Sequence, residues 1–193
     1  MLKVLKNTAV LFLKKSDIFI LFIVPLFLIN ISPLSPTAKI VLKTPVYCLT
    51  SLGIYLYLLY DKPIQLFSVR LVFSYFLTDF GITMAYYFFV LIVQMMPLSI
   101  VLHLLIIYFF GLYFLCRFSI IPALIVNQNR LSLHNILLLS QNSYSQWMTA
   151  ATILYLPFLF IEILVPEGIA YSFITSLQSP LLCCFYVCYL KKR

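Results

Sequence analysis

The feature that most constrains this chain is a succession of apolar stretches, nearly free of charge, separated by short breaks that contain Lys and Arg. Only 9% of the residues are charged and 64% are apolar. Soluble domains carry about 25% charged residues, so most of this surface must face something other than water. We therefore predict an all-α, polytopic membrane protein. The formal charge of +8 does not indicate a nucleic-acid partner, because the cations lie between apolar runs where lipid headgroups are found.

Six apolar stretches are predicted to be transmembrane helices within one membrane domain, residues 1–193. The predicted spans are residues 17–34, 45–60, 71–96, 98–116, 148–165 and 169–190. The basic start and the first apolar run also resemble a signal peptide. The proline-rich segment that follows favours an uncleaved span, which Pro25 is expected to kink. Spans three and four are joined so briefly that we expect antiparallel neighbours.

Lys and Arg in the short loops predict the orientation of these spans. With a cytoplasmic N-terminus, eleven cations fall on the cytoplasmic side: Lys3, Lys6, Lys14, Lys15, Lys62, Arg70, Arg117, Arg130, Lys191, Lys192 and Arg193. Only Lys39 and Lys43 fall on the other side. We therefore predict that both termini are cytoplasmic.

Two interfacial segments are predicted beside the spans. Residues 1–15 form a helix expected to lie in the headgroup plane, with Lys3, Lys6 and Asn7 on one side and Leu2, Leu5, Ala9 and Phe12 on the other. Between spans four and five we expect an elbow at the membrane surface. Its predicted parts are Arg117 reaching lipid phosphates, a bend at Pro122, a helix over 133–142 capped by Ser132, and Trp147 as an interfacial anchor.

The elbow sequence "RFSIIPA…NRLSLHNILLLS" resembles the YciC family of enterobacterial inner-membrane proteins. It also resembles the membrane domains found beside some glycerophosphodiester phosphodiesterases. The matching positions are Arg117, Pro122, Ala123, Ser132 and Ser140. His134-Asn135 stands where the family usually has an acidic-alanine pair, which weakens the expected capping box. The resemblance implies a multi-pass protein of the bacterial inner membrane with no assigned biochemical role. The phosphodiesterase domain is absent, so its chemistry does not transfer.

No catalytic motif is visible. The sequence contains no G-x-S-x-G, H-E-x-x-H or P-loop pattern. Since His103 and His134 are the only histidines, a histidine-rich metal centre is excluded. The five cysteines lie in apolar runs and are interpreted as small buried hydrophobic residues: Cys48, Cys116, Cys183, Cys184 and Cys188. We predict no enzymatic activity, no catalytic or metal-binding residue and no cofactor.

Three ionisable residues fall within or near the predicted spans: Asp79, His103 and Glu162. The functional interpretation is a proton or cation path, with Asp79 as its main group. The structural interpretation, which we prefer from sequence, has Asp79 in the bundle interior, protonated or hydrogen-bonded to Thr78 or nearby tyrosines. In that interpretation Glu162 pairs with His103 or reaches water. The 14 Tyr and 18 Phe residues are assigned to packing and lipid contact, since the sequence does not indicate an aromatic cage.

The leading functional prediction is a non-enzymatic integral inner-membrane protein with an accessory or envelope-maintenance role. The first alternative is a small transporter or channel subunit that uses Asp79. A further alternative is an immunity protein against a membrane-active bacteriocin. The predicted partners are the lipid bilayer, anionic headgroups at the cytoplasmic face, and a membrane protein or a second copy of the chain.

Overall fold

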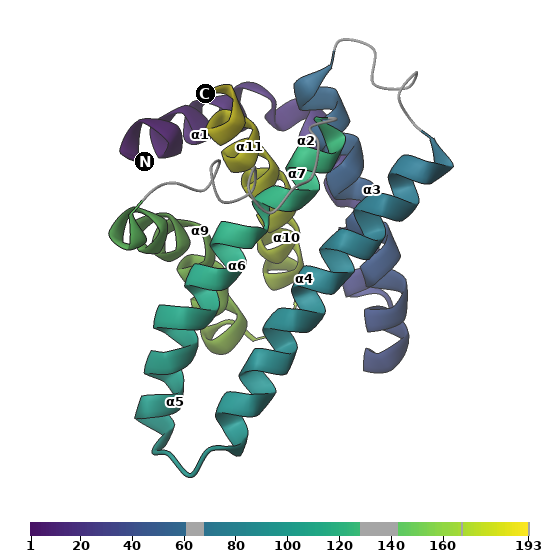
Figure 1. Cartoon of the computed structure of the whole chain (residues 1–193). Coiled ribbons are helices and arrows are strands. Elements are labelled where there is room, and N and C mark those ends of the chain that lie inside the picture. The colour runs from purple at the N-terminus through teal and green to yellow at the C-terminus, as the bar shows by residue number, and fades with distance from the viewer. Residues whose placement is uncertain (61–67, 128–142, 167, 193) are drawn as a thin grey trace.

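The computed structural model of the chain is all-α over the residues that it describes, 1–60, 68–127, 143–166 and 168–192 (Figure 1). The elements are α1 (Leu2–Lys14), α2 (Ser16–Ile31), α3 (Pro36–Leu59), α4 (Val69–Met95), α5 (Ile100–Ile106), the π-helix η2 (Ile107–Leu112), α6 (Tyr113–Phe118), α7 (Ile120–Val126), α9 (Tyr144–Leu164), α10 (Ile169–Ser176) and α11 (Gln178–Lys191). Serine hydroxyls start three of these helices by accepting a backbone N–H: Ser35 for α3, Ser68 for α4 and Ser99 for α5.

Among the residues that the structure describes, four helical stretches are long and apolar enough to cross a membrane. They are Val41–Leu59, Val69–Met95, Ile100–Val126 and Ile169–Lys191. The helix Ser16–Ile31 is apolar but has only 16 residues, or about 24 Å at 1.5 Å per residue. That length falls short of a hydrocarbon core of about 30 Å. A helical membrane protein with several spans is therefore supported, while the count of six and the orientation stay predictions.

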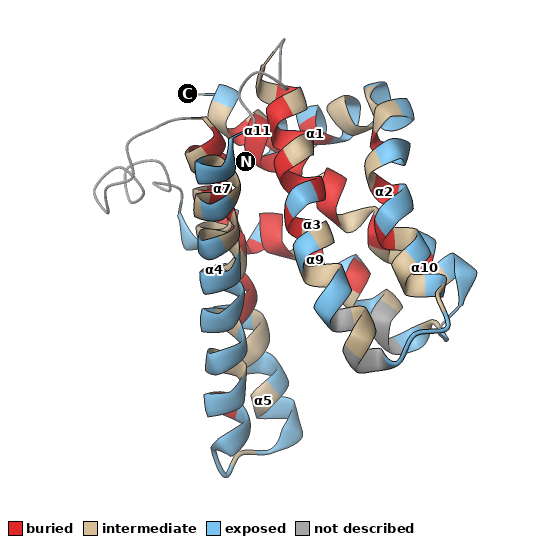
Figure 2. Ribbon diagram, turned by 90° about the vertical axis from the view of Figure 1, so that its right-hand side faces the viewer, coloured by how far each residue is buried: buried red, intermediate tan, exposed pale blue. Residues whose placement is uncertain are grey.

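The helices form a bundle from which one hairpin extends. α3 and α4 run in opposite directions, and α4 returns through a tight turn into α5 to make the long hairpin at the bottom of Figure 1. α1 lies across the opposite end of the bundle, beside the end of α11. Figure 2 shows that burial is concentrated in α11, α7 and the upper part of α3, whereas most of α4 and α5 is exposed. In a bilayer, those exposed apolar side chains would contact acyl chains.

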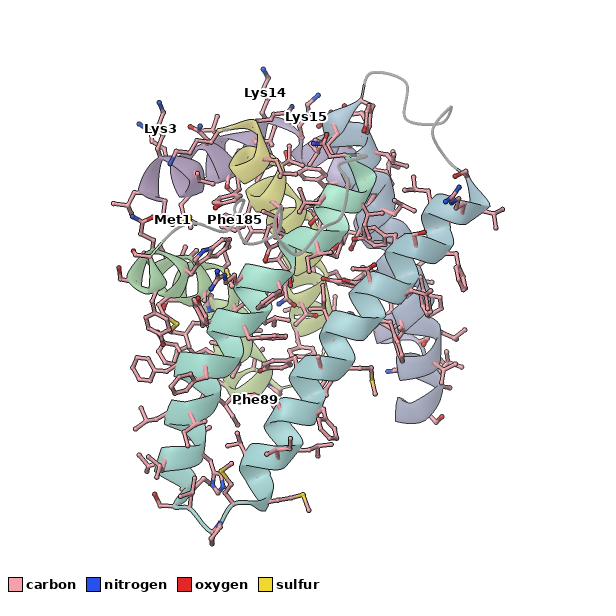
Figure 3. All side chains as sticks on the ribbon, viewed as in Figure 1. Met1, Lys3, Lys14, Lys15, Phe89 and Phe185 are labelled. Atoms are coloured by element: carbon pink, nitrogen blue, oxygen red, sulfur yellow. The ribbon has the colours of Figure 1, made fainter. Side chains whose placement is uncertain are left out.

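The cations are distributed unequally between the two ends of the bundle. Lys15 Nζ donates to Tyr57 Oη at 3.0 Å, and Lys191 Nζ donates to the Leu58 carbonyl at 3.2 Å, both at the C-terminal end of α3. Lys3 and Lys14 project from the same end (Figure 3). Lys39 lies at the other end, where its Nζ donates to the Asn30 carbonyl at 2.8 Å. Lys3, Lys14, Lys15 and Lys191 therefore lie at one end and Lys39 at the other, as the predicted grouping requires. Lys62, Arg130 and Arg193 lie outside the described residues, and the compartment that each end faces stays a prediction.

The predicted end of the fourth span at residue 116 is wrong. Helical structure continues to Val126, and Ile120, Ala123 and Val126 are buried in the core. A break occurs at Ser119, just before Pro122 enters the first turn of α7, where the missing N–H of proline costs little. The expected bend therefore exists, but the segment packs inside the bundle. The predicted helix over 133–142 lies outside the described residues, as does its Ser132 cap.

Two side chains of the predicted elbow lie differently from expectation. Trp147 is 0% exposed, so it does not face lipid headgroups. Its ring packs against Tyr189 and Phe185 of α11, with centroids 5.2 and 6.4 Å away. The reason is that the face of α9 that carries Trp147 is directed toward the core of the bundle. Arg117 is partly buried rather than extended toward lipid. It donates to the Tyr113 hydroxyl, and its guanidinium lies 5.7 Å from the centre of that ring.

α1 also packs with a different face from the one predicted. Val4 and Thr8 are buried against the bundle, and Leu5 and Phe12 are partly buried. Leu2, which was expected on the apolar side with Leu5, is 73% exposed. The cause is the neighbouring α11, which gives α1 a protein surface to cover in addition to the membrane surface.

Candidate functional site

A cavity of about 490 Å³ lies inside the bundle between α3, α4, α9 and α11, with η2, α6 and α7 completing its wall. Its lining is rich in hydroxyl groups. The polar lining residues are Lys43, Thr44, Tyr47, Cys48, Ser51, Tyr55, Tyr75, Asp79, Thr83, Tyr86, Tyr87, Ser119, Tyr155, Gln178, Ser179, Cys183 and Tyr186. A cavity lined by so many residues with polar groups, among helices that are apolar enough to cross a membrane, is the strongest candidate site among the described residues.

Helical periodicity explains how so many polar groups reach one cavity. On α3, Thr44, Cys48, Ser51 and Tyr55 recur at intervals of four, three and four residues, which places them on one face. On α4, Tyr75, Asp79 and Thr83 follow one another at intervals of four residues. On α11, Ser179, Cys183 and Tyr186 are spaced by four and three residues. These stripes are visible in the sequence. Sequence reasoning nevertheless missed the site, because no pattern within one helix shows which helices adjoin.

Asp79 lies in the wall of this cavity, near the middle of α4. The thiol of Cys48 donates to its Oδ2 at 3.3 Å, and Tyr47 and Tyr75 line the same cavity. The predicted interior position is therefore supported by the geometry. The predicted Thr78 partner is wrong, because the Thr78 hydroxyl donates to the carbonyl of Ser74, one turn earlier, at 2.8 Å.

Four tyrosines close one end of the cavity. Tyr55, Tyr75, Tyr155 and Tyr186 are each at most 6% exposed. The rings of Tyr55 and Tyr75 have centroids 6.1 Å apart, and the hydroxyls of Tyr155 and Tyr186 are 3.3 Å apart. The Tyr186 hydroxyl also donates to the Cys116 carbonyl at 2.8 Å, next to the helix break at Ser119. This end is therefore sealed by packed rings and directed hydrogen bonds.

A buried polar contact joins α3 to α11 along the cavity wall. The hydroxyls of Ser51 and Ser179 are 2.7 Å apart, and the Cys183 thiol donates to the Ser51 carbonyl at 3.7 Å. Within the described part of the chain, no buried side-chain nitrogen or oxygen lacks a hydrogen-bond partner. The polar lining is therefore an ordered network, as a polar group in a low-dielectric interior requires.

The opposite end of the cavity is open. Thr83 and Tyr87 of α4 are exposed there, and Tyr87 is 59% exposed. Lys43 of α3 stands at the same level, because α3 and α4 are antiparallel and Lys43 precedes Cys48 by five residues, or about 7.5 Å of helix. The cavity thus has a cation near its mouth, a carboxyl group in its middle and tyrosines at its closed end.

The second ionisable candidate, His103, does not join Asp79. His103 Nε2 is 3.1 Å from the carbonyl of Met96 in the hairpin turn, and the residue is not part of the cavity lining. The side chain of Glu162 lies outside the described residues, so its predicted pairing with His103 is not tested.

The cysteine thiols do not form a metal site in the described structure. All five cysteines are free, and two of them, Cys48 and Cys183, line the cavity. No group of three or more His, Cys, Asp or Glu side chains that could hold a metal ion occurs among the residues that the structure describes. Among the described residues, the chemistry of the site is therefore that of one carboxyl group, one amine, one amide, two thiols, hydroxyls and aromatic rings.

The chain matches no protein-family model, no curated protein and no solved structure.

Proposed function

We propose that the protein is a membrane carrier that binds a small solute in the cavity beside Asp79. The observation that supports this function is the cavity itself, which is closed at one end by tyrosines and open at the other. Polar or ionisable groups within a membrane are costly and usually serve a ligand, an ion path or a specific partner. Solute sites in transporters typically lie between helices near the middle of the bilayer.

The position of Asp79 along its helix fits such a site. It lies ten residues after Val69, or about 15 Å along α4, and sixteen residues before Met95, or about 24 Å. A carboxyl group at that depth is far from either end of the helix. The structural interpretation explains the bond from Cys48 to Asp79, but it does not explain why polar side chains from several helices surround an open volume.

We also retain the proposal that the chain is a YciC-like protein of the bacterial inner membrane, without enzymatic activity. This proposal rests on the sequence pattern "RFSIIPA…NRLSLHNILLLS", of which Pro122 lines the cavity. An accessory envelope role is compatible with a carrier. No observation on the described residues favours the immunity protein.

A carrier exposes its binding site to the two sides of the membrane in turn, and this property gives the test. Ser119 lines the cavity near its closed end and is partly buried. In a background with all five native cysteines replaced by serine, we expect Ser119→Cys to react with a charged, membrane-impermeant maleimide in vesicles of either orientation. Thr149→Cys is the matched control, because Thr149 is exposed on α9 away from the cavity and should be shielded by lipid.

Labelling of Ser119→Cys from the two sides of the membrane has three possible outcomes. Labelling of Ser119→Cys from both sides supports a carrier. Labelling from one side alone indicates a binding pocket without transport, and resistance from both sides indicates a purely structural cavity. Either of the last two results would overturn the proposed function.

A further inference from the structure

We infer that the solute is a small organic cation, an amine or a quaternary ammonium, held by Asp79 within a cage of tyrosine rings. This inference rests on the proposed function and names its substrate class. It depends on the charge of the lining, on the aromatic groups around that charge and on the shape of the volume.

The charge of the cavity interior points to a positive ligand group. Among the residues that the structure describes, Asp79 is the only acidic residue of the lining, and Lys43, the only basic one, stands near the mouth. A ligand whose positive group reaches the middle of the cavity meets the carboxyl group, whereas Lys43 is five residues, or about 7.5 Å of helix, from Cys48, which contacts Asp79. A divalent metal ion fits poorly, because the described residues of the lining offer one carboxylate against two positive charges.

The aromatic lining favours an organic cation over a hydrated inorganic one. Seven tyrosines line the cavity: Tyr47, Tyr55, Tyr75, Tyr86, Tyr87, Tyr155 and Tyr186. A cation within about 6 Å of such a ring is attracted by its quadrupole, and the attraction grows when water is excluded. Tyr75 precedes Asp79 by one turn of α4, and Tyr47 precedes Cys48, whose thiol donates to Asp79, so a cation at that carboxyl group meets a wall of the cavity that carries both tyrosines.

The shape of the cavity sets the orientation of the ligand. The closed end is made of fully packed tyrosines, and the open end is lined by Thr83, Tyr87 and Lys43. A volume of about 490 Å³ lies in the range of pockets that hold organic molecules of moderate size. The ammonium group therefore reaches Asp79 while the rest of the ligand extends toward the mouth, where Lys43 disfavours a second positive group.

The test measures binding of radiolabelled benzyltrimethylammonium to the purified full chain by equilibrium dialysis. We expect saturable binding with one site per chain. Benzenesulfonate, an anion of similar size, should not compete. Asp79→Asn should weaken binding by tenfold or more, since charge-assisted contacts are among the strongest available to a ligand. Asp17→Asn is the matched control, because Asp17 is exposed at the start of α2 and should bind as the parent does.

Two further variants separate charge and ring contributions from folding. Tyr75→Phe keeps the ring and should bind within about threefold of the parent, whereas Tyr75→Leu removes it and should weaken binding by about tenfold. Lys43→Gln should strengthen binding by about twofold, because it removes a like charge near the mouth. This last variant leaves Asp79 intact, so it remains informative if Asp79→Asn does not fold.

The possible results are distinct. Absence of saturable binding by the folded parent, equal competition by benzenesulfonate, unchanged binding by folded Asp79→Asn, or weaker binding by Lys43→Gln would each overturn the inference. If any of these occurs while Ser119→Cys still labels from both sides, the carrier stands and its substrate belongs to another class. If Ser119→Cys labels from one side alone or from neither side, the proposed function itself fails.

Discussion

The hydroxyl of Tyr186 joins three helices at the closed end of the cavity, and its removal gives a sharp test of this packing. It donates to the Cys116 carbonyl at 2.8 Å and lies 3.3 Å from the Tyr155 hydroxyl, in a residue that is 1% exposed. Tyr186→Phe removes one oxygen and keeps the ring. The Cys116 carbonyl then loses a partner in a dry interior, at a cost of about 1–3 kcal/mol.

The loss of stability caused by Tyr186→Phe can be measured as a decrease in Tm in detergent. For a chain of 150–250 residues, 1 kcal/mol corresponds to a shift in Tm of about 2–4 °C. We therefore expect Tyr186→Phe to lower Tm by roughly 2–12 °C on the same scale. Tyr87→Phe is the control, because Tyr87 is 59% exposed at the open end, and its Tm should stay within about 1 °C of the parent.

The pair Tyr155 and Tyr186 permits a stricter form of the same test. If the two hydroxyls share one network, the double Phe variant should lose less stability than the sum of the single variants, with a coupling of about 0.5–1.5 kcal/mol. An unchanged Tm for Tyr186→Phe, or strict additivity of the two changes, would refute the hydrogen-bonded closure. The cavity end would then be held by ring packing alone.

Three further predictions concern the fold. A reporter that is active only in the cytoplasm should give signal when fused after Arg193 and none when fused after Lys43; signal at Lys43 would reverse the predicted orientation. Trp147→Ala should destabilise the protein by about 3–5 kcal/mol, measured as loss of folded protein on thermal challenge, because the ring is fully buried against Tyr189. A surface anchor would lose much less. Gly111→Val should lower Tm, since even a Cβ at this position lies 3.1 Å from the Tyr86 ring; a Tm equal to that of the parent, against Gly81→Ala as control, would show that the ring moves aside freely.

Sequence reasoning located most apolar helices because hydropathy along one segment is a local property. The third span predicted at 71–96 corresponds to α4, and the last, predicted at 169–190, corresponds to Ile169–Lys191. The first prediction to fail was the end of span four. Pro122 was interpreted as an exit from the membrane, whereas the apolar residues around it pack against α4 and α11. Proline marks a helix start as readily as a helix end, and only tertiary contacts decide between them.

The candidate site was only partly accessible to sequence reasoning. Asp79 was identified because a carboxyl group in an apolar stretch is conspicuous. Its partner Cys48, however, lies 31 residues earlier on another helix. Several of the tyrosines that were assigned to packing and lipid contact form walls of the cavity. Their role depends on which helix faces they occupy relative to α3, α9 and α11. That information belongs to helix packing, which no single periodic pattern contains.

The length of α4 couples the cavity to the thickness of the membrane. α4 has 27 residues, or about 40 Å of helix, while the hydrocarbon core measures about 30 Å. A helix with this excess accommodates by tilting, and the tilt required changes with bilayer thickness. Because only Tyr75 and Val93 of α4 are buried, the bundle restrains this helix weakly. A thinner bilayer will therefore increase the tilt of the helix that carries Asp79. Because this helix forms part of the cavity wall, the acyl-chain length of the lipids changes the position of that wall.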